Sequence, residues 1–136
     1  MVHLGAELAE VSPGRVVIRL PFRDELAQQH GFFHAGTTTA IADSAGGYAG
    51  LSVFSEDGEV LTVEFKINLL APARGECLEA TGSVIRSGRT LTVCQLGVFA
   101  VAAGERILVA LGQQTLMRMQ QVGPARTAPA TPARYA

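Results

Sequence analysis

The most regular hydrophobic pattern in the chain lies between residues 61 and 69. Hydrophobic and polar residues alternate there without interruption, which is the period of a strand with one buried and one exposed face. The pattern assigns Leu61, Val63, Phe65, Ile67 and Leu69 to the buried face and Thr62, Glu64, Lys66 and Asn68 to the polar face. We therefore predict a strand here, after a turn at residues 56–58.

Five further β-prone runs are bounded by residues typical of turns. Residues 3–11 and 15–20 surround Ser12-Pro13-Gly14 and predict a hairpin. After the alternating strand, residues 76–86, 90–101 and 106–119 predict three more strands, the first two joined at Ser87-Gly88-Arg89. Because four long strands follow one another through short turns, we expect them to form an antiparallel meander.

One helix is predicted between the hairpin and these strands. Residues 36–53 contain no proline and several alanines, although Gly46, Gly47 and Gly50 each lower helix propensity. A helix of this length, about 25 Å, is expected to compensate for its glycines by packing closely against a sheet or a partner chain. The predicted fold class is therefore α+β, with one central helix against an antiparallel sheet.

Length and composition narrow the class of protein. A chain of 136 residues favours one domain, which we place at residues 1–119, and the Pro- and Ala-rich residues 120–136 are expected to be disordered. A net charge of -1 argues against nucleic acid as a partner, and no apolar run reaches the roughly 18 residues of a membrane span. With no secretory signal and two cysteines, Cys77 and Cys94, outside any metal or redox spacing, we expect a cytoplasmic protein with reduced core thiols.

The polar loop before the helix carries the residues best suited to chemistry. The segment from Gln28 to Asp43, QQHGFFHAGTTTAIAD, resembles the signature of hotdog-fold acyl-CoA thioesterases of the phenylacetate-degradation (PaaI-like) type, related to 4-hydroxybenzoyl-CoA thioesterases. That signature reads N-x-x-G-x-x-H-G-G, then six residues, then D. The matching residues are Gly31, His34, Gly36 and Asp43, whereas Gln28 and Ala35 replace the usual Asn and Gly.

The resemblance extends over residues 3–119 and includes the strand from Thr62 to Pro72. It implies a hotdog fold and hydrolysis of an acyl-CoA thioester. We expect no cofactor and no metal ion, because this hydrolysis requires only water, a base and an oxyanion site. The resemblance also implies a homodimer at least, and a tetramer if dimers pair, with sites at the subunit interface. Each site would take Asp43 from one chain and Thr62 from the other, and residues of the loop, Gln28, Gly31 and Ala35, would contact the substrate.

Elementary chemistry of the same residues agrees with this interpretation. The first N–H groups of a helix have no helical partner, so the amides of Ala35 to Thr37 can stabilise charge on a thioester oxygen. Asp43 follows Gly36 by seven residues, close to two helical turns, and projects on the same side of the helix. Its carboxylate could attack the carbonyl carbon or activate a water molecule.

Several of these residues also have a simpler interpretation. His34 could cap the helix rather than take part in chemistry, and Thr62 could be a solvent-facing strand residue. The turn residues Ser87, Gly88 and Arg89 could contact the CoA phosphates, or only form the hairpin. A metal site at His30, His34 and Asp43 is disfavoured because Gly31 and the loop keep both histidines off one helical turn.

Two other function classes compete with a thioesterase. A hotdog hydratase or dehydratase also pairs a loop histidine with a helix acid, and a hotdog protein can bind acyl ligands without catalysis. Asp43 and Gly36 favour catalysis over binding alone. The sequence does not specify the acyl group, which could be aromatic or a short or medium chain.

Overall fold

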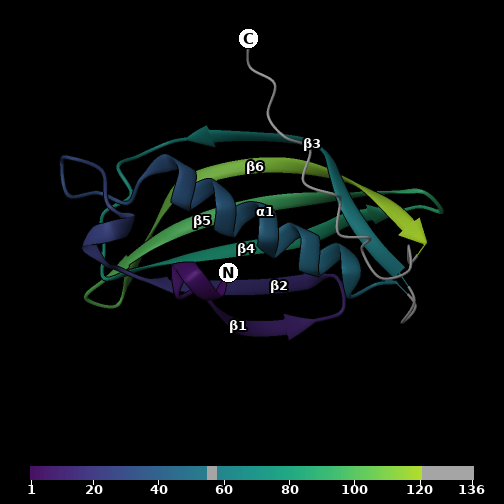
Figure 1. Cartoon of the computed structure of the whole chain (residues 1–136), viewed down its shortest axis with the longest axis horizontal. Coiled ribbons are helices and arrows are strands. Elements are labelled where there is room, and N and C mark those ends of the chain that lie inside the picture. Colours follow the sequence, from purple (N-terminus) through teal and green to yellow (C-terminus); the bar gives the residue numbers. More distant parts are fainter. Residues whose placement is uncertain (55–57, 121–136) are drawn as a thin grey trace, which may run out of the picture.

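The computed structural model describes residues 1–54 and 58–120, which form one α-helix packed against a six-stranded antiparallel sheet. The sheet curves around the helix, with β1 at one edge and β3 at the other (Figure 1). This is the predicted α+β, hotdog arrangement. The elements are α1 (Ala35–Leu51), β1 (Glu7–Ser12), β2 (Arg15–Pro21), β3 (Gly58–Leu69), β4 (Cys77–Ser87), β5 (Leu91–Ala102), β6 (Glu105–Gln120), and two short 3-10 helices, η1 (Val2–Leu4) and η2 (Asp24–Leu26).

The strand order differs from the predicted meander. β4, β5 and β6 pair in succession, but β3 pairs with β6, and β4 lies between β5 and β2. Between β3 and β4 the chain runs past the start of the helix, where Phe33 N–H donates to the carbonyl of Ala73 over 2.9 Å. Residues 70–76 are therefore a crossover between distant strands rather than a hairpin, and β3 is left as a sheet edge.

Two of the three helix glycines, Gly46 and Gly50, are compensated by close packing against the sheet as predicted, whereas Gly47 has no neighbour within 4 Å of an added Cβ. Gly46 and Gly50 are buried, and the helix meets β4 at Gly82. A Cβ added at Gly82 would lie 2.3 Å from the carbonyl oxygen of Ala45. This clash would be with the helix backbone, which cannot move aside as a side chain can by changing its rotamer. Small residues on both sides thus bring the helix backbone into contact with the strand, and the core fills in around this contact.

A β-bulge in β3 corrects the predicted assignment of its faces. The pairing of β3 with β6 shifts register between Thr62 and Glu64, so the alternation of inward and outward side chains is reset there. Thr62 lies toward the helix, whereas Leu61 and Val63 are each 52% exposed. The hydrophobic pattern hid the bulge because it continues unbroken through it.

Further predictions concern the first strand, the cysteines, the turn before β3 and membrane-spanning segments. The start of the predicted hairpin, residues 3 and 4, belongs to η1 instead of a strand, and both cysteines are free and buried. The predicted turn at residues 56–58 and the predicted disordered tail fall mostly outside the described residues. Within the described part of the chain, no helix is both long enough and apolar enough to cross a bilayer.

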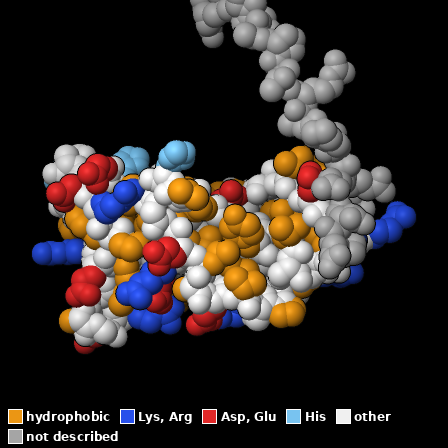
Figure 2. Space-filling view, turned by 60° about the horizontal axis from the view of Figure 1, so that its bottom comes forward, with side chains coloured by type: hydrophobic (Ala, Val, Ile, Leu, Met, Phe, Trp, Pro, Cys, Tyr) orange, Lys and Arg blue, Asp and Glu red, His pale blue; other side chains and the backbone are white. Residues whose placement is uncertain are grey.

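Hydrophobic side chains also reach the surface. Figure 2 shows them gathered over the middle of one face of the molecule. On the edge strand β3 and the residue that follows it, Leu61, Val63, Leu69 and Leu70 are all exposed. An exposed, apolar sheet edge of this length is a surface that proteins ordinarily cover.

Candidate functional site

The loop before α1 is folded around Gly31 and capped at the helix start by His34. Gly31 has φ of 77°, a conformation that favours glycine, and its N–H donates to the carbonyl of Gln28 over 2.9 Å. The side-chain oxygen of Gln28 accepts from His30 N–H over 2.5 Å. Gln28 and Gly31 therefore build the turn, and His30 contributes its backbone to it.

His34 is the N-cap of the helix. Its Nδ1 accepts a hydrogen bond from Gly36 N–H over 2.9 Å, and its carbonyl accepts from the buried Thr38. The capping interpretation of His34 is therefore the one this geometry favours. Among the described residues, no hydrogen-bond partner faces the amides of Ala35 and Thr37, so these two N–H groups are open at the positive end of the helix.

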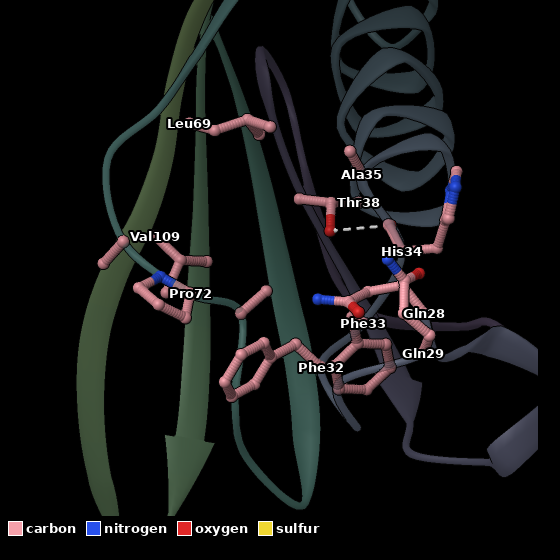
Figure 3. A pocket seen from close by; sticks show the side chains of 12 residues that line it. Gln28, Gln29, Phe32, Phe33, His34, Ala35, Thr38, Leu69, Pro72 and Val109 are labelled. Carbon is pink, nitrogen blue, oxygen red and sulfur yellow. Dashed lines mark hydrogen bonds between the residues drawn. The ribbon is translucent and has the colours of Figure 1, made fainter.

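A cavity of about 480 Å³ lies in front of this helix start. Figure 3 shows Gln28, His34, Ala35 and Thr38 on one side of it, facing Leu69, Pro72 and Val109 on the other. The side chains of Phe32 and Phe33 close one end. The cavity thus combines apolar walls with the helix start at Ala35, whose amide is open, a suitable arrangement for an uncharged group that carries a carbonyl.

Two turns further along the helix, the Asp43 carboxylate is held by side chains of two strands. Thr62 on β3 donates to Asp43 Oδ1 over 2.8 Å, and Gln114 on β6 donates to the same oxygen over 2.6 Å. The Gln114 Nε2 group also lies 3.0 Å from Thr62 Oγ1 and 3.1 Å from the Asp43 carbonyl oxygen. The bulge in β3 is what turns Thr62 toward the carboxylate.

Asp43 and Thr62 border a second hollow, separate from the cavity at the helix start. It has a volume of about 210 Å³, and its other lining residues are Ser44, Gly47, Tyr48, Leu51 and Val60. No residue lines both spaces. Within one chain, Asp43 and Ala35 at the helix start therefore border different pockets.

The turn Ser87-Gly88-Arg89 lies at the opposite end of the helix from the loop. Ser87 Oγ is 3.1 Å from Thr92 Oγ1, and a Cβ added at Gly50, near the helix C-terminus, would lie 3.8 Å from Thr92 Cγ2. The structure thus brings Asp43 together with Thr62, and Gln28 with His34 and Ala35, but leaves this turn apart from both groups.

Gln114 is the residue of this site that sequence reasoning missed. It is fully buried, and it occupies an inward-facing position of β6 between Gly112 and Leu116. A polar residue at an inward position of a strand is the signal that could have indicated it.

No group of three His, Cys, Asp or Glu side chains in residues 1–54 and 58–120 is arranged to bind a metal ion.

Comparisons with known proteins agree with this architecture. The family model described as the Thioesterase superfamily matches residues 30–105. A crystal structure of a thioesterase family protein from Silicibacter pomeroyi is 44% identical, with a TM-score of 0.87 over 89% of each chain.

Two further matches are more distant. A thioesterase from Haemophilus influenzae is 25% identical, with a TM-score of 0.80 over 88% of this chain and 81% of that one. A 1,4-dihydroxy-2-naphthoyl-CoA hydrolase from Listeria monocytogenes is 24% identical over 70% of this chain and 77% of its own length. The chain belongs to the thioesterase superfamily, as its loop and helix motif predict, and it is a thioester hydrolase.

Proposed function

We propose that the protein is a cytoplasmic acyl-CoA thioesterase that hydrolyses an aromatic or a short- or medium-chain acyl-CoA to the free acid and CoA. The observation that carries this proposal is the Asp43 carboxylate, held at Oδ1 by Thr62 and Gln114 beside a hollow with apolar walls. The two free, buried thiols are consistent with a reducing compartment.

The reaction can use the Asp43 carboxylate in either of two roles. As a general base, Asp43 takes a proton from water while the water oxygen attacks the thioester carbonyl carbon. The C–S bond then breaks, and the proton passes to the leaving thiolate. As a nucleophile, the carboxylate would attack the carbonyl carbon and displace the CoA thiolate, and water would then open the resulting acyl anhydride to the free acid and restore the carboxylate. Both routes need only water and a site for the negative oxygen.

The helix start supplies that site. The amides of Ala35 and Thr37 are open at the positive end of α1, so a carbonyl oxygen there could accept two hydrogen bonds. Gly36 N–H is already bonded to His34 Nδ1, and it becomes a third donor only if the imidazole ring turns away. His34 thus controls how many amides are available.

These two parts of the machinery are too far apart to act together within one chain. Gly36 and Asp43 are seven residues apart in a continuous helix, which is about 10 Å along its axis. A reacting carbonyl must lie within about 3 Å of both its hydrogen-bond donors and its nucleophile. We therefore propose that each site joins the helix start of one chain to Asp43 of a second copy.

The free edge strand β3 offers a contact that meets this requirement. Leu69 lines the cavity at the helix start, and Thr62, on the same strand, borders the Asp43 hollow. If two copies of β3 pair antiparallel about a twofold axis between Phe65 and Lys66, Leu69 of one copy lies opposite Thr62 of the other. The same contact covers the exposed apolar side chains of this edge. Within one chain Thr62 donates to Asp43 Oδ1, so we propose that Thr62 supports the Asp43 of its own chain instead of acting with the Asp43 of the other.

The turn at residues 87–89 is the contact that we propose for the CoA end of the substrate. Arg89 lies within a turn that is closed by a hydrogen bond from Gly88 N–H to the carbonyl of Leu91 over 2.8 Å. A guanidinium there could pair with a phosphate group. Replacement of Arg89 by alanine is then expected to raise KM for acyl-CoA without lowering kcat.

The test is thiol release from a panel of acyl-CoA esters. The panel comprises benzoyl-, phenylacetyl-, hydroxyphenylacetyl-, butyryl-, hexanoyl- and decanoyl-CoA, and each ester is assayed with the unaltered protein and with Asp43→Asn. Asp43→Asn is expected to lower kcat about 10²-fold to 10⁴-fold while CoA binding persists. Stoichiometric binding of unchanged acyl-CoA would instead indicate a binding protein, and hydration of an enoyl-CoA would indicate a hydratase.

A further inference from the structure

Gln114 is a buried polar side chain placed against the carboxylate of Asp43. It is fully buried on β6, and its Nε2 group contacts Asp43 Oδ1 over 2.6 Å, the Asp43 carbonyl oxygen over 3.1 Å and Thr62 Oγ1 over 3.0 Å. A hydrogen bond from an amide to an ionised carboxylate is stronger than one between neutral groups. Every partner of this amide therefore belongs to the Asp43–Thr62 pair.

The orientation of the amide is fixed by the carboxylate. With its oxygen toward Asp43, two acceptor oxygens would face each other at hydrogen-bond distance, so the NH₂ group must occupy that side. The Gln114 Oε1 atom is then buried, with no hydrogen-bond partner among the described residues. A side chain that served stability alone would pair both ends of its amide, because an unpaired buried oxygen costs free energy.

The helix also accommodates this side chain. A Cβ added at Gly46 would lie 1.9 Å from Gln114 Oε1, so the two cannot coexist in this arrangement. Gly46 lowers the helix propensity of α1, and Gln114 leaves an acceptor unpaired. The lower helix propensity and the unpaired acceptor both accompany one contact, the hydrogen bond from Gln114 to Asp43.

We propose that Gln114 is a positioning residue for the reaction assigned above. Two donors, Gln114 and Thr62, converge on Oδ1 and fix the rotation of the carboxylate, while Oδ2 has no hydrogen-bond partner in the described part of the chain. The free oxygen is then the one that meets water or the thioester carbon. This inference rests on the proposed function, since it assigns how Asp43 is aimed.

The first test replaces the amide by an apolar side chain of similar shape. Gln114→Met removes the donor to Asp43 and also removes the unpaired oxygen. We expect kcat to fall about 10-fold to 100-fold, KM to stay within about twofold, and Tm to equal or exceed that of the unaltered protein. Gln113→Met is the matched control, because Gln113 is exposed at the next position of the same strand, and its kcat should not change.

The second test keeps the shape and changes only the proton. Gln114→Glu places a second carboxyl group at hydrogen-bond distance from Asp43, and two such groups share a proton. The introduced carboxyl donates to Asp43 only while it is protonated, so kcat of this variant should fall as pH rises over a range where the unaltered enzyme is constant. A role in filling space would leave the pH profile unchanged.

The outcomes separate this inference from the proposed function. An unchanged kcat in Gln114→Met overturns the positioning role. A lower kcat in Gln114→Met also overturns it if the Tm of that variant falls as well and the pH profile of Gln114→Glu is unchanged. If the unaltered protein hydrolyses no acyl-CoA, the proposed function fails instead. The crystal structure of Gln114→Met then decides the positioning role: a turned Asp43 carboxylate supports it, and an unchanged one overturns it.

Discussion

Gly46 and Gly47 are adjacent glycines in α1 whose replacement by alanine should have opposite effects on stability. A Cβ at Gly46 would lie 1.9 Å from Gln114 Oε1 and 2.6 Å from Leu96 Cδ2, whereas a Cβ at Gly47 would have nothing within 4 Å. Both substitutions raise helix propensity by about 1 kcal/mol. Only Gly46→Ala also forces two packed side chains apart, at a cost of about 1–3 kcal/mol.

The difference between the two variants is the quantity to measure. Gly47→Ala should be the more stable by about 2 kcal/mol, or roughly 6 to 12 °C in Tm for a domain of this size. Thermal unfolding of both variants at one protein concentration gives this difference, with urea unfolding as a second measure. Equal Tm values would refute the reasoning, because they would mean that Gln114 does not occupy the space beside Gly46.

Two further predictions concern single side chains. His34→Ala should lower the free energy of unfolding by about 1 kcal/mol because the helix loses its cap, whereas His34→Asn, which keeps an acceptor, should lose less; denaturant unfolding that ranked them in the reverse order would contradict the capping role. Burial raises the pKa of the Cys94 thiol from its ordinary value of 9.0 to about 11, so the unfolded chain loses this proton first as pH rises. The free energy of unfolding should therefore fall by about 2–3 kcal/mol between pH 9 and 11 relative to Cys94→Ala, and parallel pH dependences of the two proteins would contradict this.

Much of the fold could be predicted from local patterns. The helix and the strands follow from periodicity and turn residues, and their observed bounds differ by a few residues. Strand order could not be predicted this way, because β3 pairs with β6 through contacts distant in sequence. The crossover at residues 70–76 contains Pro72 and Gly75, which are equally typical of a tight turn.

In the candidate site, too, the residues that are close in sequence could be predicted and the distant ones could not. The loop motif identifies Gln28, His34 and Asp43 because they are close in sequence. Gln114 lies 71 residues from Asp43, and only the folded sheet brings them together. The turn of Thr62 toward Asp43 depends on a bulge that an unbroken alternation of residue types conceals.

The central claim is that the helix start of one chain and Asp43 of another act on one thioester. Its most direct test is complementation between two inactive variants, Asp43→Asn and Ala35→Pro. Proline removes the Ala35 amide, one of the two open N–H groups at the helix start, and the first position of a helix tolerates proline. Each variant alone should be nearly inactive, provided that circular dichroism shows both to be folded.

Co-expressed with different affinity tags and purified as heterodimers, the two variants should recover about half of the unaltered activity, because one of the two sites in each dimer is then intact. Activity no higher than that of the separate variants would contradict the account. It would mean that Asp43 works with the helix start of its own chain, or that the two do not work together.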